Sequence, residues 1–269
     1  MSASTSRQEI GNLRMLLIAV FILLIPAALI TTTIRVAISE PAVYDYGVRN
    51  YGAEKASGIP HSELLQANQQ IRNYLVDTDA GPLAPRVTNN AGEVESLFNA
   101  KETAHMADVR SLVQFMFKVQ ILAVAMALTL AVVMVALWPV RALAAAALYG
   151  SLLTLAVLGL TGIAAVTGFD AAWGQFHVIA FTNNLWELNP RTDHLIQMYP
   201  EAFWQEAVTA IGGFIVLQAL SLGIVSSMYL LLTRPNAKLA PPEPRLLPER
   251  DDHPRHPRLS PPNPRHYVR

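Results

Sequence analysis

The stretch MLLIAVFILLIPAALITTTI, Met15–Ile34, holds 20 uncharged residues between Arg14 and Arg35. About 20 predominantly apolar residues let an α-helix cross the hydrocarbon core of a bilayer. A signal peptide is the alternative, but its apolar region is usually shorter and is followed by a small-residue cleavage site. Three later stretches are also uncharged: Val119–Val140, Ala142–Phe169 and Ala207–Thr233. Together they predict transmembrane helices at about 14–36, 113–137, 142–166 and 205–232.

The overall composition agrees with a membrane protein. Of the 269 residues, 52% are hydrophobic and 15% are charged, whereas soluble domains carry about 25% charged residues. The formal net charge is zero, so there is no bulk electrostatic reason to expect a nucleic acid partner. Cysteine is absent, which excludes disulfides, a thiolate nucleophile and cysteine-bound metals.

The expected fold is an all-α membrane protein with four transmembrane helices, a small extracytoplasmic cap and a disordered C-terminal tail rich in Pro and Arg. Residues 1–233 would form the membrane domain, with outer loops at 37–112 and 167–204. Residues 234–269 contain ten prolines, eight Lys or Arg and four acidic residues, a composition typical of disorder. The spacing of the tail histidines matches no closed metal site; they are His253, His256 and His266.

Basic residues in the short segments predict the orientation. The leader with Arg7 and Arg14, the link with Arg141 and the basic tail share one side of the four crossings. Lys and Arg concentrate on the cytoplasmic side of membrane proteins. Both termini are therefore expected to be cytoplasmic, and both long loops to face outward.

Two finer predictions concern packing. Leu64, Ile71 and Leu75 recur at helical spacing within 61–75, which predicts an amphipathic helix with Ser62 as its N-cap. Glycines in the third and fourth transmembrane stretches would allow close helix contacts in lipid. They are Gly150, Gly159, Gly162, Gly212, Gly213 and Gly223.

The outer loops concentrate polar side chains that a simple connection does not need. Gln175–Trp204 holds two histidines, three asparagines, an aspartate and two glutamates among aromatic residues. In the other loop, Glu102, His105 and Asp108 follow at i, i+3 and i+6 just before the second apolar stretch, so neighbouring members can share a helical face. Because both loops are expected on one side, these two groups can meet.

Four interpretations of these residues stay open from composition and spacing. The histidines can be structural. Glu102-x-x-His105 has the spacing used in carboxylate-bridged metal sites, to which Asp193-His194 could add ligands, but such sites need two copies of the motif. Acid–base chemistry without metal or cofactor suits imidazole, whose pKa lies near neutral pH. A non-enzymatic membrane assembly factor or receptor could instead bind a lipid or lipoprotein through its outer loops.

Within the acid–base interpretation, acyl transfer fits a pair of histidines. One would activate a nucleophile, and the other, or backbone N–H groups, would stabilise the oxyanion. The sequence has no Gly-x-Ser-x-Gly motif and no cysteine. An acyl-enzyme is therefore poorly supported, and a nucleophile carried by the substrate fits better.

Two motifs make the chain resemble the bacterial lipoprotein intramolecular transacylases, within a wider group of integral membrane proteins. The resemblance covers roughly residues 10–232. The first motif is Glu102-x-x-His105-Met-x-Asp108-Val. The second comprises Phe176-His177, Phe181, Asn184, Trp186, Pro190, Asp193, Leu195-Ile196, Pro200-Glu201 and Phe203.

The resemblance implies a reaction and its partners. Such enzymes move the sn-2 acyl chain of the diacylglyceryl group on a lipoprotein's N-terminal cysteine to that cysteine's own α-amine. The product is a lyso-form lipoprotein. The implied partners are diacylglyceryl-modified lipoproteins and membrane lipid, and the implied location is the bacterial cytoplasmic membrane. No acyl-enzyme, metal or cofactor is expected.

The resemblance also assigns residues. The family's two essential histidines correspond to His105 and His177, and which one is the base stays open. Candidates to fix the imidazole tautomers are Glu102, Asp108 and Asp193, and candidates to shape the site are Asn183, Asn184 and Trp186. Two of these have simpler interpretations, since Asp193 can cap a helix from about His194 and Trp186 can anchor at the membrane interface.

Overall fold

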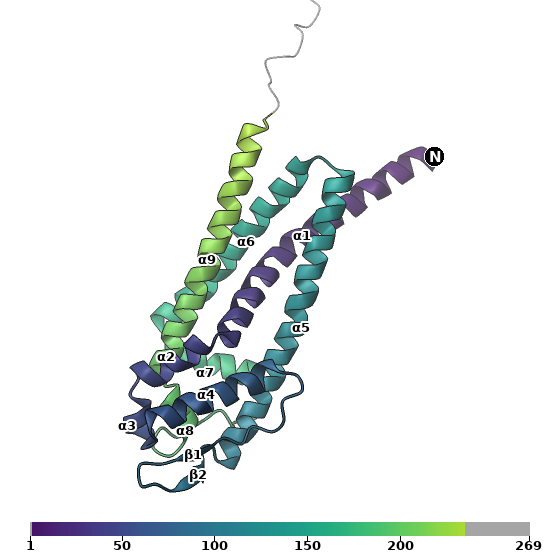
Figure 1. The fold of residues 1–269 in the computed structure, drawn as a ribbon. Coiled ribbons are helices and arrows are strands. Elements are labelled where there is room, and N and C mark those ends of the chain that lie inside the picture. The colour runs from purple at the N-terminus through teal and green to yellow at the C-terminus, as the bar shows by residue number, and fades with distance from the viewer. Residues whose placement is uncertain (1, 235–269) are drawn as a thin grey trace, which may run out of the picture. The chain divides into compact units, whose positions relative to one another are not determined.

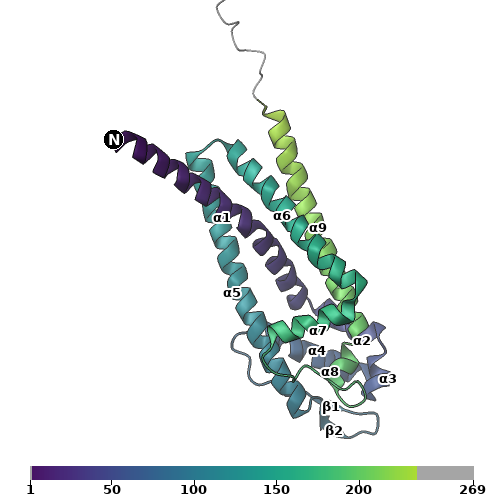
Figure 2. The ribbon, with the colours of Figure 1, turned by 180° about the vertical axis from the view of Figure 1, so that it is seen from behind.

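Four long helices lie side by side and carry a smaller cap at one end (Figures 1 and 2). The structure is a computed structural model that describes residues 2–234, so the predicted disordered tail lies outside the described residues. The long helices are α1 (Ser2–Ser39), α5 (Ala100–Leu137), α6 (Val140–Thr167) and α9 (Glu201–Leu232). Within the described residues, these four are long and apolar enough to cross a membrane. The prediction of an all-α protein with four transmembrane helices is confirmed.

The bundle buries little of its own apolar surface. Its small core consists of Phe21, Met134, Ala146 and Ala147. Large apolar side chains point outward along every long helix; Leu160, for example, is 77% exposed. Such a surface suits a bilayer, since water would disfavour so large an apolar patch.

Only some of the glycines permit close packing. A Cβ added at Gly150 of α6 would lie 2.6 Å from Ile25 of α1, and one at Gly223 of α9 would lie 2.8 Å from the Ser151 hydroxyl. The prediction of close contacts is confirmed there. It is wrong for the glycines that would meet nothing within 4 Å, which are Gly159, Gly162, Gly212 and Gly213.

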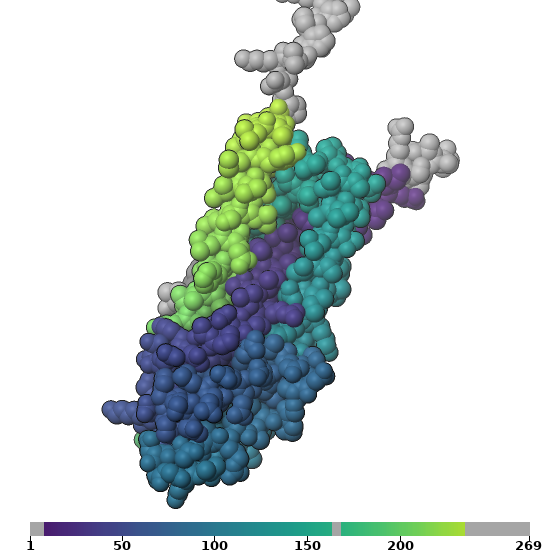
Figure 3. Space-filling model, viewed as in Figure 1, coloured from purple at the N-terminus to yellow at the C-terminus, as the bar shows by residue number. Residues whose placement is uncertain are grey.

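The cap is built from short elements of two chain segments, one between α1 and α5 and the other between α6 and α9. They are α2 (Pro41–Asn50), α3 (Ala53–Ser57), α4 (His61–Val76), β1 (Arg86–Thr88), β2 (Val94–Ser96), α7 (Phe169–Ala180) and α8 (His194–Met198). The two strands pair antiparallel, with Val87 opposite Glu95. Figure 3 shows the residues that α2 to β2 contribute packed as one continuous surface at the end of the bundle.

The amphipathic helix predicted at 61–75 is confirmed as α4. Its apolar face is buried in the cap core with Met106 of α5 and Met198 of α8. The helix begins at His61 after Pro60, and no side chain caps it. The prediction of Ser62 as the N-cap is therefore wrong, because Ser62 already lies inside the first turn.

The helix that bears His105 and the second transmembrane stretch are one element. Asn99 and Glu102 form a reciprocal capping box at the start of α5, an arrangement that satisfies two unpaired N–H groups. A helix of 38 residues is about 57 Å long, well beyond the roughly 30 Å of a hydrocarbon core. The first turns of α5 therefore extend into the cap, and His105 sits on a rigid helix.

The end of the bundle opposite the cap holds basic side chains. The start of α1, the α5–α6 link and the end of α9 all lie there (Figure 1). The Arg14 guanidinium lies 5.3 Å from the centre of the Trp138 ring. Arg141 donates hydrogen bonds to the Leu230 carbonyl and the Thr233 hydroxyl, so it satisfies the C-terminus of α9.

Candidate active site

His177 lies on α7, a short helix that follows α6 and crosses the end of the bundle where the cap begins (Figures 1 and 2). The sequence predicts an outer loop at 167–204, yet Phe169–Ala180 is helical. Phe169, Trp173 and His177 recur every four residues and share the inward face. Helical spacing therefore buries His177, which is 8% exposed.

The structure brings the two predicted histidines together. Their ring centroids are 6.1 Å apart, with an angle of 37° between the planes. His105 comes from α5 and is 6% exposed. Phe181 packs its edge against the His105 ring at 5.2 Å. Two imidazoles at this separation can act on neighbouring atoms of one substrate molecule, since catalytic groups must reach hydrogen-bond distance of those atoms.

Two tryptophans hold the His177 ring. Trp186 stacks on it, with centroids 4.9 Å apart and planes 28° apart. Trp173 meets it nearly perpendicularly at 4.8 Å. Together they restrict the orientation of the imidazole plane. Trp186, which the resemblance makes a candidate to shape the site, therefore lies against His177.

A backbone carbonyl sets the tautomer of His177. Its Nδ1 lies 2.8 Å from the Trp173 oxygen, and a carbonyl can only accept, so Nδ1 carries the proton. Nε2 is then left with a free lone pair. Burial lowers the pKa of His177, and the bond to the Trp173 carbonyl offsets part of that shift. His177 is thus a neutral imidazole with an available acceptor at neutral pH.

His105 has an unsatisfied polar atom. Its Nδ1 is buried and has no hydrogen-bond partner among the described residues. Leaving a buried polar atom unpaired costs about 1–3 kcal/mol, and such atoms are uncommon in folded proteins. This atom therefore stays unpaired among the described residues, on a ring that lies beside His177.

Glu102 does not orient either histidine. One carboxylate oxygen belongs to the capping box with Asn99. The other accepts a 2.7 Å hydrogen bond from the Leu195 N–H of α8. The side chain is almost fully buried, and these bonds satisfy it. The Glu102 side chain therefore joins the start of α5 to α8. It makes none of the histidine contacts that were expected of a residue that fixes an imidazole tautomer.

Asp193 also joins the segment before α8 to the start of α5. It accepts hydrogen bonds from the Asn189 N–H at 2.7 Å and from the Asn99 side chain at 3.0 Å. Burial raises the pKa of Asp193, but hydrogen bonds from Asn189, Thr192 and Asn99 together outweigh it and hold the pKa below its ordinary value. Helix α8 does begin at His194, although the Asp193 side chain makes no capping bond to it.

Asp108 and Asn183 meet at the exposed edge of the site. The Asn183 amide donates a 2.9 Å hydrogen bond to the Asp108 carboxylate. The Asn183 carbonyl accepts from the Trp186 indole N–H at 3.0 Å, and the Asn184 carbonyl accepts from the Glu187 N–H. These contacts shape the turn that places Trp186 on His177.

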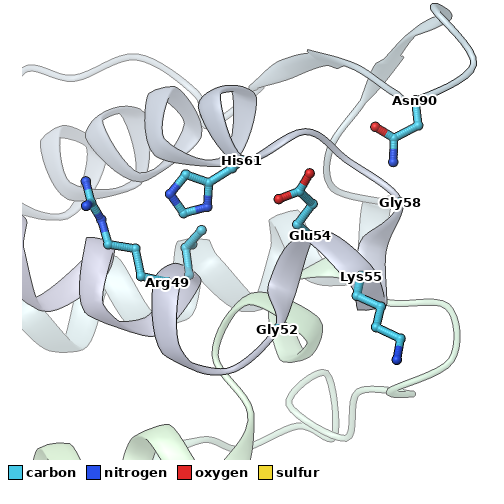
Figure 4. A pocket seen from close by; sticks show the side chains of 8 residues that line it. Arg49, Gly52, Glu54, Lys55, Gly58, His61 and Asn90 are labelled. Atoms are coloured by element: carbon cyan, nitrogen blue, oxygen red, sulfur yellow. The ribbon is translucent and has the colours of Figure 1, made fainter.

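Metal ligation has no support in the part of the chain that the structure describes. Within it, no three or more His, Cys, Asp or Glu side chains are grouped as a metal would require. A pocket of about 480 Å³ lies elsewhere on the cap, lined by residues of α2 to α4 and Asn90. In Figure 4, Glu54 and His61 border this pocket and Lys55 extends away from it. It contains none of the predicted site residues.

Trp173 and Asn99 were not among the predicted site residues. Trp173 precedes His177 by one helical turn, so recognition of 169–180 as a helix would have pointed to it. Asn99 stands three residues before Glu102, which is the spacing of a capping box. Both signals are local and were readable in the sequence.

Comparisons with known proteins agree on one family. The sequence profile of the family described as lipoprotein intramolecular transacylase Lit matches residues 18–204. No curated protein gives a significant sequence match. The fold is similar to that of the membrane-integral lipoprotein intramolecular transacylase Lit from Bacillus cereus, with a TM-score of 0.71, 18% identity and coverage of 82% of this chain and 97% of that one.

Two structures of Bacillus cereus Lit with a histidine substituted show the same fold. The alanine variant has a TM-score of 0.69 at 18% identity and covers 84% of this chain and 97% of its own. The arginine variant has a TM-score of 0.67 at 17% identity, with coverages of 87% and 100%. At such identities, the structures establish the fold alone. The profile match covers more than half of the chain, and the chain therefore belongs to the lipoprotein intramolecular transacylase Lit family.

Proposed function

We propose that this protein moves the sn-2 acyl chain of a diacylglyceryl-cysteine lipoprotein to the α-amine of the same cysteine. The observation that carries the proposal is the buried pair His105–His177, found in a member of the Lit family. The substrate supplies the nucleophile, so the reaction needs no acyl-enzyme. What the site must supply is a proton acceptor, a proton donor and exclusion of water.

The unequal surroundings of the histidines support a division of labour. His177 Nε2 is the acceptor that takes the proton lost by the attacking amine, because Nδ1 is committed to Trp173. A neutral imidazole keeps one N–H, so His105 can donate a proton to the departing sn-2 oxygen. The amide C–N bond forms, the ester C–O bond breaks, and return of the proton from His177 to His105 restores both residues.

The substrate and the site have compatible protonation states. An α-amine has a pKa of about 7.7–8.0, so part of it is neutral and nucleophilic near pH 7. The lowered pKa of His177 keeps the acceptor unprotonated there. Burial of both rings keeps bulk water from competing for the ester. Asp108, Asn183, Asn184 and Trp186 serve the reaction by holding His177 and the turn that covers it.

The direct test is mass spectrometry of lipoprotein N-termini from bacteria that express this chain in place of other N-acylating enzymes. The expected product carries one acyl chain on nitrogen and one on the glyceryl group. Unchanged diacyl lipoproteins, with the protein present in the membrane, would contradict the proposal. Purified protein should also convert a synthetic diacylglyceryl peptide, which a protein that only binds lipoproteins would not do. Product formation that persists in both His105→Ala and His177→Ala would remove the histidine mechanism.

We also propose that the cap faces outward in a bacterial cytoplasmic membrane and that both termini are cytoplasmic. The basic end of the bundle, with Arg14 and Arg141, supports this orientation. The chain has no cysteine, so single-cysteine variants can be labelled cleanly. A membrane-impermeant maleimide should label Asn90→Cys in intact cells, and Val140→Cys only after permeabilisation. The reverse pattern would overturn the orientation.

A further inference from the structure

Lys101 lies one helical turn before His105 on α5. Lys101, His105 and Asp108 stand at i, i+4 and i+7, a spacing that places all three on one face of a helix. Lys101 is exposed, whereas His105 is buried. The face of α5 that presents His105 to the site therefore also carries a cation and a carboxylate, one on either side of the histidine.

Both charged side chains bind the segment that follows α7. The Lys101 ammonium donates a hydrogen bond to the Glu187 backbone carbonyl, and the Asp108 carboxylate accepts one from the Asn183 amide. Along the helix axis, Lys101 and Asp108 are about 10 Å apart. The segment between Asn183 and Glu187 is therefore bonded to α5 at both ends, on either side of His105.

This segment carries Trp186. The Trp186 indole stacks on His177, and its N–H donates to the Asn183 carbonyl. The bond from Lys101 is made to the very next residue, Glu187, and a hydrogen bond from an ammonium is stronger than one between neutral groups. Lys101 thus fixes one end of the turn that holds the indole on His177, as Asp108 fixes the other end.

The charge of Lys101 also reaches the His105 ring, but only weakly. Burial has the largest effect on the pKa of His105 and lowers it to about 4, together with the neighbouring His177 and Lys101 and against Asp108. Of these contributions, that of Lys101 is the smallest, as expected of an exposed ammonium whose field is screened by solvent. The effect of Lys101 on the site therefore comes mainly through its bond to Glu187.

We propose that Lys101 is a positioning residue of the acyl transfer site, which keeps Trp186 stacked on His177 by holding the Glu187 carbonyl. Lys101 acts through Trp186 and does not touch the substrate. Its loss frees one end of the turn, so that the indole restricts the His177 ring less. The consequence for turnover rests on the proposed function, whereas the consequence for the position of Trp186 does not.

The first test observes the turn directly, by fluorine NMR of the full-length protein in detergent with fluorotryptophan at its four tryptophans. The resonance that disappears in Trp186→Phe belongs to Trp186. In Lys101→Met, whose side chain has neither donor nor charge, this resonance should shift or broaden. It should keep its wild-type position in Lys101→Arg, which can still donate, and in Lys118→Met, which removes a charge further along α5. An unchanged Trp186 resonance in Lys101→Met would overturn the proposal.

The second test is conversion of a diacylglyceryl peptide. Turnover in Lys101→Met should fall by up to roughly tenfold, the range expected for loss of the Trp186 stack, and Lys101→Arg should restore most of it. In a Trp186→Leu background, Lys101→Met should lower turnover by less than about twofold further, because residues that act through one another are not additive. Full additivity, or a rise in turnover in Lys101→Met, would overturn the positioning role. A wild type without turnover would contradict the proposed function, and the Trp186 resonance would still decide the role of Lys101.

Discussion

The Nδ1–H of His177 donates a 2.8 Å hydrogen bond to the carbonyl oxygen of Trp173, one turn earlier on α7. The contact ties the tautomer of His177 to local backbone geometry, because it leaves Nε2 as the nitrogen with a free lone pair. It also needs no second side chain. The short helix α7 supplies both the imidazole and the carbonyl that fixes its tautomer.

This contact predicts that stability and activity can be separated at position 177. In His177→Asn, the amide can still donate to the Trp173 carbonyl, whereas His177→Leu cannot. We expect Asn to be more stable than Leu by about 1 kcal/mol, the net worth of one hydrogen bond. Both should lose at least roughly 100-fold in turnover, because neither supplies a base. Thermal unfolding and conversion of a diacylglyceryl peptide measure the two effects, and an active Asn variant would contradict the assignment of the base.

The lowered pKa of His177 predicts a dependence of stability on pH. The ordinary pKa of histidine is about 6.5, and burial lowers it in the folded protein. The unfolded chain therefore binds more protons at this residue as the pH falls below 6.5. The stabilising contribution is complete above 6.5 and is lost as the pH falls towards the folded value. Unfolding midpoints between pH 7 and 5 should fall more steeply in the wild type than in His177→Asn, and equal slopes would contradict this.

Glu102 and Asp108 should differ when each is replaced. Glu102→Ala removes a buried capping box and the partner of the Leu195 N–H, and we expect a loss of about 1–3 kcal/mol. Asp108→Ala removes one exposed contact to Asn183, which should cost under about 1 kcal/mol. Denaturation in detergent tests the ranking. A Glu102 variant that keeps full stability but loses turnover would show that the carboxylate acts in the chemistry.

The stacking of Trp186 on His177 predicts graded effects of substitution. Trp186→Phe retains an aromatic face, whereas Trp186→Leu does not. An aromatic contact of this kind is worth about 0.5–1.5 kcal/mol, so turnover should fall by up to roughly tenfold in the Leu variant and less in the Phe variant. Peptide conversion by the two purified variants measures this order. Equal activity in both would show that the stacked face is dispensable.

Helix packing in the bundle predicts opposite outcomes for two glycines of α6. The Cβ of Gly150→Ala would lie 2.6 Å from Ile25, whereas that of Gly159→Ala would meet nothing within 4 Å. Overpacking costs about 1–3 kcal/mol, so the first variant should unfold at lower temperature. The second should equal or exceed the wild type, because Ala favours a helix over Gly by about 1 kcal/mol. Equal unfolding temperatures for the two variants would contradict this prediction, since they would mean that α1 can move away from α6 at no cost in stability.

The sequence predicted the transmembrane helices well because their signal is local and strong. An uncharged run such as Met15–Ile34 has few alternatives in a folded membrane protein. The proximity of His105 and His177 could also be expected, since two crossings separate their loops and so put both loops on one side. The motif resemblance named these residues before their geometry was known.

Other parts of the site could not be predicted from the sequence, for a physical reason. The partner of a carboxylate depends on which backbone N–H groups the fold leaves unpaired near it. Glu102 meets Leu195 only because α8 packs against the start of α5. The Trp173 group that bonds His177 is a backbone carbonyl, which every residue type has, so the sequence does not point to it. This carbonyl comes within reach of His177 only because α7 is helical. Packing likewise selected Gly150 and Gly223 from six similar glycines.

The long projection of α5 beyond the bundle has a consequence for assembly. His105 leaves the membrane on a helix whose partners, α7 and α8, lie much later in the chain. At the start of that helix, the Asn99 amide also donates to Asp193 and the Glu102 carboxylate also accepts from the Leu195 N–H, and both partners arrive only with the segment before α9. A chain that has inserted only its first two transmembrane helices therefore holds His105 without His177. On the proposed mechanism, the site is therefore incomplete until the third crossing brings α7 to the cap.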